Sequence, residues 1–295
     1  MPCREMMSCK LRSAIAGLAV FACLFLRVQG SSPLLLEEWC GVVPQINLKI
    51  ANGKPAEFGG YPWIALLHQR KIFFCAGSLL NHWFVLTAGH CISDGAPVIA
   101  RLGEYNRDTD IDCDNNNRCL DPVQDYKVDM LFRHRLYNDK DYTNDIGMLR
   151  LERKVEYTLH IQPICIIVNS DIQPYVDEIT WFKATGWGRT SGDAKFASRV
   201  LLELDINRRP KADCVKAFRQ HLTPKQICVG NDDGNLCNGD SGGPQGRNAT
   251  VYGIERFVQL GIASYTNKNC SKVSILTDVT RYGKWIRKVV EWYGR

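Results

Sequence analysis

Residues 238–244 read NGDSGGP, and this stretch decides the expected fold. Glycines flank the pair Asp240–Ser241, so the backbone can turn sharply there and present the Ser241 hydroxyl. The N–H groups of Gly239 and Ser241 are then free to hold a negative charge that develops on an oxygen atom. A glycine-rich turn around one serine is usually only a turn, so its meaning depends on partners elsewhere in the chain.

Two other stretches supply the groups that a nucleophilic serine needs. Residues 86–91 read LTAGHC, with His90 after an apolar run, and residues 144–151 read NDIGMLRL, with Asp145 before a run fit to be buried. A serine hydroxyl is a weak nucleophile at neutral pH, and it needs a base whose charged form a third group stabilises. His90, Asp145 and Ser241 fit these roles, and their order along the chain distinguishes this arrangement from the other Ser-His-Asp folds.

The rest of the chain predicts an all-β fold. Its 295 residues, 45% hydrophobic and 23% charged, suit one large β domain or two smaller ones. Short apolar runs alternate with Gly, Asn, Asp and Pro, which favours antiparallel strands over alternating β and α units. From Val279, apolar residues up to Trp292 recur at helical spacing, so we expect a C-terminal α-helix capped by Asp278 or Thr280. The expected strand-like runs are 73–80, 83–88, 145–151, 160–168 and 258–265.

Residues 1–30 predict a secretory signal peptide. Three basic residues (Arg4, Lys10 and Arg12) precede the apolar run 13–26, and small residues near Gly30 suit cleavage. The run is shorter than the roughly 20 apolar residues that span a bilayer, so we expect no membrane anchor. We therefore expect a secreted, extracellular protein.

Cysteine usage agrees with an oxidising compartment. Of the thirteen cysteines, Cys3, Cys9 and Cys23 lie in the expected signal peptide, and ten remain for five disulfides. No CxxC pair occurs and the six histidines do not cluster with the cysteines, so a metal site is not expected. The net charge of +6 is not concentrated in a long run, which gives no case for nucleic-acid binding.

The three motifs together resemble the signatures of the chymotrypsin/trypsin family of serine peptidases, over about residues 50–293. GWG at 186–188 and GIASY at 261–265 are further matches. The resemblance implies two packed six-stranded antiparallel β-barrels with a C-terminal α-helix and a catalytic cleft between the barrels. It implies a serine endopeptidase that forms an acyl-enzyme and needs no cofactor.

The same resemblance implies a role for each motif residue. Ser241 attacks the scissile carbonyl, and His90 takes the serine proton and later gives it to the leaving amine. Asp145 fixes the imidazole and accepts a hydrogen bond from Ser264. The N–H groups of Gly239 and Ser241 form the oxyanion hole.

Lys49 and Ile50 resemble the family's activation site. Cleavage after Lys49 by a protease of trypsin-like specificity would free the ammonium of Ile50, which would pair with Asp240 and order the oxyanion hole and the substrate pocket. The sequence after the cut departs from the family pattern, because Ala51 and Asn52 replace a branched residue and Gly. The expected organisation is a signal peptide (1–30), a pro-segment (31–49) and a peptidase domain (50–295).

The resemblance also pairs the cysteines. It implies Cys40–Cys165, Cys75–Cys91, Cys214–Cys228 and Cys237–Cys270, which leaves Cys113–Cys119 as an extra bridge. Phe182 and Arg247 stand where many family members have another disulfide. The absence of that disulfide and the presence of Cys113–Cys119 resemble arthropod clip-domain cascade proteases. The pro-segment, with one cysteine, is too short for a clip domain. Protein inhibitors such as serpins are implied partners, together with protein or peptide substrates.

The implied substrate pocket departs from the trypsin pattern. Asn235 stands two residues before Cys237, where trypsin-like relatives carry an aspartate at the pocket base. A neutral base cannot stabilise a desolvated guanidinium, so we expect small or medium uncharged side chains to be preferred. The remaining pocket residues are Leu236, Ser264, Tyr265, Thr266 and Ser274. The alternative reading is a catalytically weak or inactive homologue that acts as a binding or regulatory protein.

Two surface features are weaker signals. The polar loop Glu104–Asp121 begins like the family's calcium loop, but Val123 stands where an acidic ligand is expected, which favours a solvated acidic loop over a calcium site. Asn248 begins the glycosylation sequence Asn-Ala-Thr on an expected surface loop. A second such sequence, at Asn269, includes Cys270 and is less suited to modification.

Overall fold

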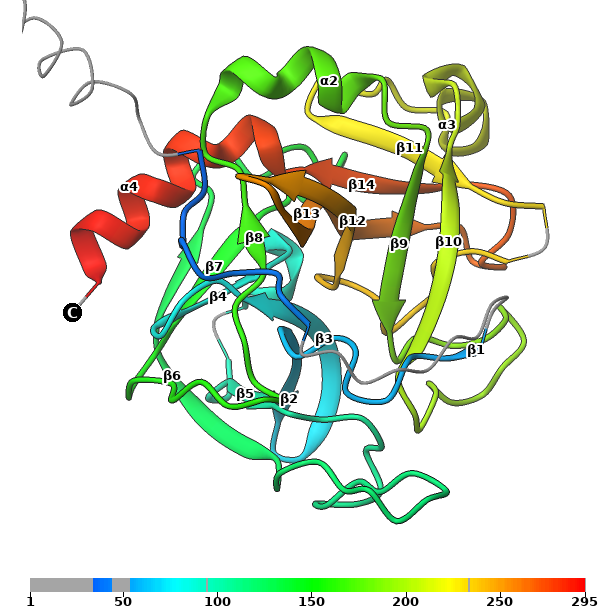
Figure 1. The fold of residues 1–295 in the computed structure, drawn as a ribbon. Coiled ribbons are helices and arrows are strands. Elements are labelled where there is room, and N and C mark those ends of the chain that lie inside the picture. The colour runs from blue at the N-terminus through cyan, green and yellow to red at the C-terminus, as the bar shows by residue number, and fades with distance from the viewer. Residues whose placement is uncertain (1–33, 44–53, 94, 233, 295) are drawn as a thin grey trace, which may run out of the picture. The chain divides into compact units, whose positions relative to one another are not determined.

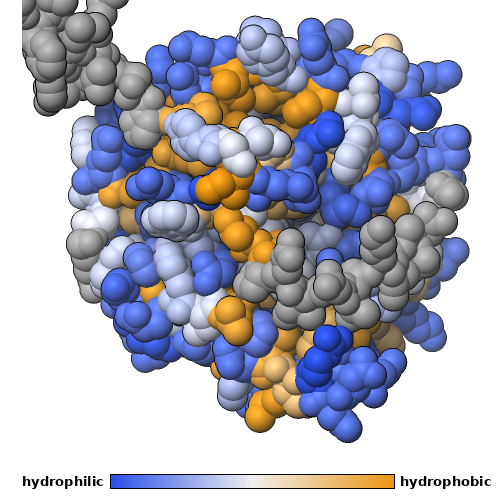
Figure 2. Space-filling view, in the orientation of Figure 1, coloured by the Kyte–Doolittle hydropathy of each residue, from blue (hydrophilic) through white to orange (hydrophobic). Residues whose placement is uncertain are grey.

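The computed structural model describes residues 34–43, 54–93, 95–232 and 234–294 (Figure 1). Residues 35–295 cluster as one compact unit. The expected signal peptide and the expected cleavage site after Lys49 lie outside the described residues. Hydrophilic residues cover most of the face in Figure 2, with hydrophobic residues between them. Within the described ranges, no helix has both the length and the apolar character to cross a bilayer.

The N-terminal half of the unit forms a closed antiparallel barrel of six strands. Strand β4 is buried along its whole length, and its side chains join the core around Trp63 and Phe84. In barrel order the strands are β2 (Ile64–Gln69), β3 (Ile72–Leu79), β4 (Phe84–Thr87), β7 (Gly147–Leu151), β6 (Gln124–Arg133) and β5 (Ile99–Leu102), which pairs with β2.

The C-terminal half forms a second six-stranded barrel. Its order is β9 (Trp181–Gly186), β10 (Leu202–Arg208), β11 (Gln226–Gly230), β14 (Ser274–Asp278), β13 (Ile254–Thr266) and β12 (Pro244–Val251), and β12 pairs with β9. Strand β1 (Lys54–Pro55) adds to β10, and β8 (Cys165–Ile166) runs parallel to β13. The prediction of two six-stranded barrels is confirmed. The expected run 160–168 is mostly loop, because only residues 165 and 166 pair with another strand.

The helices are short and few in the described ranges. They are η1 (Gly89–Cys91), η2 (Ser170–Ile172), α2 (Gln173–Asp177), α3 (Lys211–Phe218), η3 (Val279–Tyr282) and α4 (Gly283–Tyr293). The predicted C-terminal helix begins as the 3₁₀ turn η3, where Asp278 accepts a hydrogen bond from Thr280 N, and continues as α4. Ile286 and Val289 are buried. Trp292, expected on the same apolar stripe, is 66% exposed because the last turn extends past the core.

All five implied disulfides are present: Cys40–Cys165, Cys75–Cys91, Cys113–Cys119, Cys214–Cys228 and Cys237–Cys270. The Cys75–Cys91 bridge ties η1 to β3, and the Cys237–Cys270 bridge ties the turn before Ser241 to the loop after β13. Two of the five bridges therefore restrain the segments that carry the motif residues.

The described part of the expected pro-segment is bound to the second barrel by more than its disulfide. Arg256 on β13 is only 3% exposed, and its guanidinium donates to the carbonyl oxygens of Glu38 and Cys40, each at 2.9 Å. Phe257 N donates to Gly41 O at 2.7 Å. A buried cation is retained where its hydrogen bonds offset the loss of water, so Arg256 makes this segment part of the folded unit.

Candidate active site

His90 and Asp145 lie together beside the first barrel. Strand β4 ends at Thr87 and leads into η1, which carries His90, while Asp145 lies two residues before β7. His90 Nδ1 is 2.8 Å from Asp145 Oδ2, and His90 N donates to Asp145 Oδ1 at 2.8 Å. An ionised carboxylate can only accept hydrogen bonds, so the ring proton is on Nδ1 and Nε2 of the neutral ring carries the lone pair. The imidazole is therefore oriented to act as a base through Nε2.

The second barrel completes the surroundings of Asp145, which is 0% exposed. Ser264 Oγ on β13 donates to Asp145 Oδ2 at 2.5 Å, and Thr277 Oγ1 on β14 donates to the backbone oxygen of Asp145 at 2.8 Å. Both carboxylate oxygens thus have donors, as a buried charge requires. The residues of the motif NDIG are positioned by both barrels at once.

Ser241 lies in a tight turn that requires glycine. Gly242 has φ +79°, and a Cβ atom there would lie 2.2 Å from Thr87 Oγ1 and 2.3 Å from Ala76 O. In the described residues, the N–H groups of Gly239 and Ser241 donate to no protein atom, which leaves them available as oxyanion donors.

Ser241 and His90 line one cavity of about 300 Å³, together with Tyr142, Tyr265 and Thr266. Among the described residues, no hydrogen bond joins Ser241 Oγ to the imidazole. Catalytic hydrogen bonds are often loose without substrate, so this arrangement is compatible with the nucleophile and base roles.

Asp240 lies in a cradle made by the GWG motif. Its carboxylate accepts from Gly188 N at 2.8 Å and from Cys237 N at 2.9 Å. A Cβ atom on Gly186 or Gly188 would lie 2.3 Å from an Asp240 oxygen, so only glycine fits at these positions. Burial raises the pKa of Asp240 to about 6, against the lowering effect of the two backbone donors. No ion pair to the Asp240 carboxylate occurs within the described ranges. Asp240 also lines a cavity of about 210 Å³.

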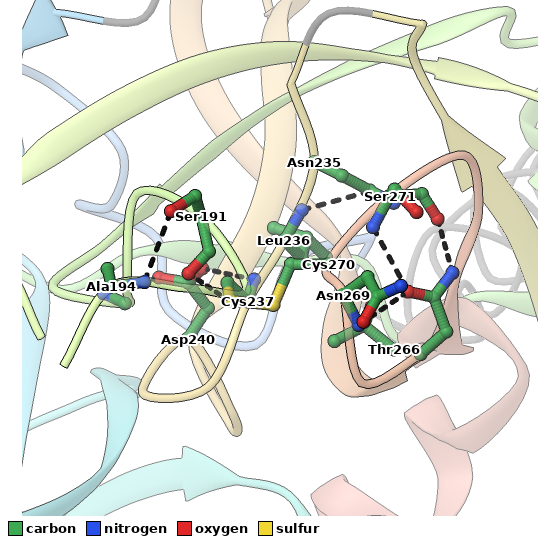
Figure 3. The surroundings of a disulfide bond; sticks show 12 residues. Ser191, Ala194, Asn235, Leu236, Cys237, Asp240, Thr266, Asn269, Cys270 and Ser271 are labelled. Atoms are coloured by element: carbon green, nitrogen blue, oxygen red, sulfur yellow. Dashed lines mark hydrogen bonds between the residues drawn. A yellow bond between two sulfur atoms is a disulfide. The ribbon is translucent and has the colours of Figure 1, made fainter. Parts of the chain in front are cut away.

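The expected pocket residues divide between two neighbouring cavities. Tyr265 and Thr266 line the Ser241 cavity, whereas Asn235 lines the cavity beside Asp240, and Leu236 lines both. Figure 3 shows Asn235 and Leu236 leading into the Cys237–Cys270 disulfide. The structure therefore does not bring Asn235 into the Ser241 cavity, because Leu236 stands between them.

Tyr142 is a site residue that the sequence reasoning missed. It has φ +52°, and its ring lies 5.7 Å from that of His90 and 4.8 Å from that of Tyr265. Phe218 lies 4.9 Å from Tyr265 on the other side. These aromatic rings form one wall beside the base, and nothing in the sequence spacing indicates the contact.

The guanidinium of Arg101 lies among carboxylates of the acidic loop. Arg101 on β5 donates to both oxygens of Asp125, and its Nη1 lies 3.5 Å from Glu104 Oε2 and 3.6 Å from Asp110 Oδ1. Asp112 accepts instead from three local donors, Tyr105 N, Asn106 N and Thr109 Oγ1. Burial raises the pKa of Glu104 to about 7, and the charge of Asp112 adds to the shift. These carboxylates do not fit a calcium site, because a guanidinium already lies among them.

One other group of possible metal ligands occurs in the described residues, formed by Cys75, His90 and Cys91. Both sulfur atoms belong to the Cys75–Cys91 disulfide, so they are not thiolate ligands.

Asn248, expected on a loop, lies instead within β12. Its side chain is exposed, and Nδ2 donates to Glu255 Oε1 at 2.7 Å. The strand is longer than the sequence indicated because β12 and β13 continue to pair as far as Val251 and Ile254.

Comparisons with known proteins agree on one family. The family model described as Trypsin matches residues 50–286. The chain is 30% identical to "Serine protease grass" of Drosophila melanogaster, over 82% of this chain and 67% of that protein. It is 33% identical to "CLIP domain-containing serine protease B9" of Anopheles gambiae, over 90% of this chain and 68% of the relative. The chain thus spans about two thirds of the length of these two relatives.

A solved structure agrees with these relatives. The crystal structure of the Drosophila Grass clip serine protease of the Toll pathway has a TM-score of 0.76 and 28% identity, and the alignment covers 87% of this chain and 76% of that one. Neuropsin, a serine protease from mouse brain, has a TM-score of 0.66 at 23% identity, over 82% of this chain and 100% of that one, and shows the fold alone.

Proposed function

The chain belongs to the trypsin family of serine proteases, and we propose that it is a secreted zymogen that cleaves proteins through an acyl-enzyme on Ser241. The observation that carries this proposal is the hydrogen bond between His90 Nδ1 and Oδ2 of the fully buried Asp145. His90 and Ser241 line the same cavity beside it. The coarser statement, a serine protease homologous to clip-domain proteases, follows from the family match.

In the proposed mechanism, Ser241 Oγ attacks the scissile carbonyl carbon as its proton passes to His90 Nε2. Asp145 stabilises the imidazolium without taking the proton, and the N–H groups of Gly239 and Ser241 hold the oxyanion. The imidazolium then protonates the leaving amine, which departs and leaves the acyl-enzyme. Water attacks the ester with His90 again as base, and the acid product and free Ser241 are released.

Activation is proposed to follow cleavage after Lys49 by a protease of trypsin-like specificity. The new ammonium of Ile50 would pair with Asp240, whose buried carboxylate accepts two backbone N–H groups but forms no ion pair in the described residues. The proposed organisation remains a signal peptide at 1–30, a pro-segment at 31–49 and a peptidase domain at 50–295.

Relatives with similar coverage suggest the kind of process. One is named "Phenoloxidase-activating enzyme 1" in Spodoptera litura and another "Spaetzle-processing enzyme" in Drosophila melanogaster, each 32% identical to this chain. We propose that this chain also acts in an extracellular proteolytic cascade, with protein substrates and protein inhibitors such as serpins. Five disulfides in the folded unit support an oxidising compartment.

The primary specificity is proposed to be non-tryptic, with small or medium uncharged side chains preferred. Asn235 carries no charge, and Thr266, which is larger than the glycine that the resemblance implies there, lines the Ser241 cavity. A narrowed cavity also favours the alternative of a weak or inactive homologue that acts by binding.

Labelling with a fluorophosphonate separates these two functions. We expect the secreted chain, after cleavage at Lys49, to react covalently at Ser241 at least tenfold faster than the uncleaved chain, because cleavage orders the oxyanion donors. Mass spectrometry of the labelled peptide identifies the serine. The matched control is Ser241→Ala, which keeps the turn and should take no label. Cleaved wild-type protein that stays unlabelled would establish the binding function instead.

We further propose that the loop Glu104–Asp121 needs no calcium, because Arg101 supplies the positive charge among its carboxylates. The melting temperature of the uncleaved chain is therefore expected to be the same in EDTA and in excess calcium. A calcium ion bound at a hundred times its dissociation constant would raise it by about 5–10 °C. A rise of that size in calcium would contradict the proposal.

A further inference from the structure

Arg107 ties the start of the acidic loop to the connection between β9 and β10. Its guanidinium donates through Nε to Ser198 O at 2.8 Å and through Nη2 to Ala197 O at 3.0 Å. Its backbone N–H donates to Arg199 O at 2.9 Å. Hydrogen bonds from a charged donor are stronger than those between neutral groups, and the Arg107 side chain is half-buried. These three bonds therefore restrain the β9–β10 connection from one residue of the loop.

The same guanidinium also contacts the first barrel. Its Cζ atom lies 4.9 Å from the ring centroid of Phe73 on β3, which is a cation–π contact. The Phe73 ring in turn lies edge-on to the ring of Trp187, with the two centroids 6.3 Å apart. Arg107 thus holds a ring from β3 and two carbonyl oxygens from the β9–β10 connection at the same time.

Gly239, one of the two expected oxyanion donors, lies against the groups that Arg107 restrains. A Cβ atom on Gly239 would lie 3.2 Å from Phe73 Cε1 and 3.0 Å from the Cα atom of Gly188. The Phe73 ring and the Gly188 backbone therefore form a wall beside Gly239. Gly188 O accepts from Ser198 N at 3.2 Å. Arg107 thus supports the wall in two ways, by contact with Phe73 and through the Ser198 backbone.

From these contacts we propose that Arg107 is a positioning residue for the oxyanion hole, which rests on the proposed function. The Gly239 N–H stabilises an oxyanion only when it is held where the charged oxygen forms. Gly239 has φ +107° and no side chain, so its own residue type supplies little restraint. Its neighbours supply the restraint, and Arg107 holds these neighbours without lining the Ser241 cavity.

A pair of phosphorus reagents measures the oxyanion hole separately from the nucleophile and the base. With a fluorophosphonate, Ser241 Oγ bonds to phosphorus, its proton passes to His90 and fluoride leaves, while the phosphoryl oxygen takes up negative charge. In the thiophosphonyl analogue a sulfur atom replaces that oxygen. Sulfur is a weak hydrogen-bond acceptor, so the oxyanion donors contribute little to its reaction. The ratio of the two labelling rates therefore reports the position of the donors and does not depend on peptide specificity.

The test measures both labelling rates for the chain cleaved after Lys49. We expect Arg107→Gln to lower the fluorophosphonate rate about tenfold, less than the roughly 10²–10³-fold cost of losing a whole oxyanion donor. The rate with the thiophosphonyl analogue should equal that of the wild type. Arg107→Lys keeps the charge but loses the planar fork of donors, so its fluorophosphonate rate should lie between those of the wild type and Arg107→Gln.

Arg118→Gln is the matched control. Arg118 belongs to the same loop and pairs with Asp114 within it, so this variant loses the same charge and should label like the wild type. An unchanged fluorophosphonate rate in Arg107→Gln, or an equal loss with both reagents, would overturn the inference. Arg107→Lys gives the same comparison if Arg107→Gln does not fold. A wild type that takes no label would refute the proposed function itself, which is a different result from a labelled wild type with unaffected variants.

Discussion

Asp145→Asn is expected to lower kcat/KM of the cleaved chain about 10⁴-fold. Asp145 Oδ1 accepts from His90 N, so an asparagine oxygen will keep that position. The new amide group then replaces Oδ2 and donates to His90 Nδ1, which moves the ring proton to Nε2. A protonated Nε2 cannot take the proton of Ser241. Steady-state rates on a peptide substrate, at matched concentrations of folded protein, measure the loss.

Ser264→Ala is the matched control for that substitution. It removes a hydrogen bond from the same carboxylate oxygen but leaves the bond to His90 and the tautomer unchanged. We expect about a tenfold loss, equivalent to one hydrogen bond of roughly 1.4 kcal/mol. Losses of equal size for the two variants would show that the tautomer is not what Asp145 controls.

Asp240→Asn is expected to have the second largest effect, and only in the cleaved chain. Removing one partner of a buried ion pair costs about 3–5 kcal/mol, which corresponds to a loss of roughly 10²- to 4 × 10³-fold in the active population. The uncleaved chain has no such pair in the described residues, so its low activity should not change. Rates before and after cleavage at Lys49, for wild type and variant, give the four values needed.

The pH dependence of stability provides an independent check of the same residue. In the uncleaved chain the pKa of Asp240 is raised to about 6 from 3.8, so the folded state holds its proton more tightly between these values. The free energy of unfolding therefore falls as the pH rises from about 4 to 6. Urea unfolding of wild type against Asp240→Asn should show this difference before cleavage. Pairing with the ammonium after cleavage should remove it, and a persistent difference would contradict the pair.

The sequence was sufficient for features that depend on short, contiguous stretches. Apolar runs between turn residues predicted the antiparallel strands, and glycines around Ser241 predicted the turn, where Gly242 does lie at φ +79°. The order of His90 and Asp145 in the chain indicated their partnership before any distance was known. The strands and the turn need only the residue types and their immediate neighbours, whereas the partnership needs the three motifs taken together.

Several contacts between distant side chains, which neither the motifs nor the resemblance implied, could not be predicted. Ser274 and Asn235 are 39 residues apart, and their hydrogen bond depends on rotamers that residue order does not specify. The same holds for the ring of Tyr142 against His90, and for Arg101 among the carboxylates of the acidic loop. The sequence placed Asn235 at a pocket base, but it could not show that Leu236 separates it from the Ser241 cavity.

The short strand β1 has a consequence for the proposed activation by cleavage after Lys49. Its two residues pair with Glu203 and Leu202 on β10, which both line the cavity beside Asp240 (Figure 1). Ile50 lies four positions before Lys54 in the chain, so a new N-terminus there can lie at most about 14 Å from β1. Such a tether gives the ammonium an effective concentration of the order of millimolar at its binding site. Activation of the cleaved chain should therefore be independent of dilution, and a free peptide would compete for Asp240 only above that concentration.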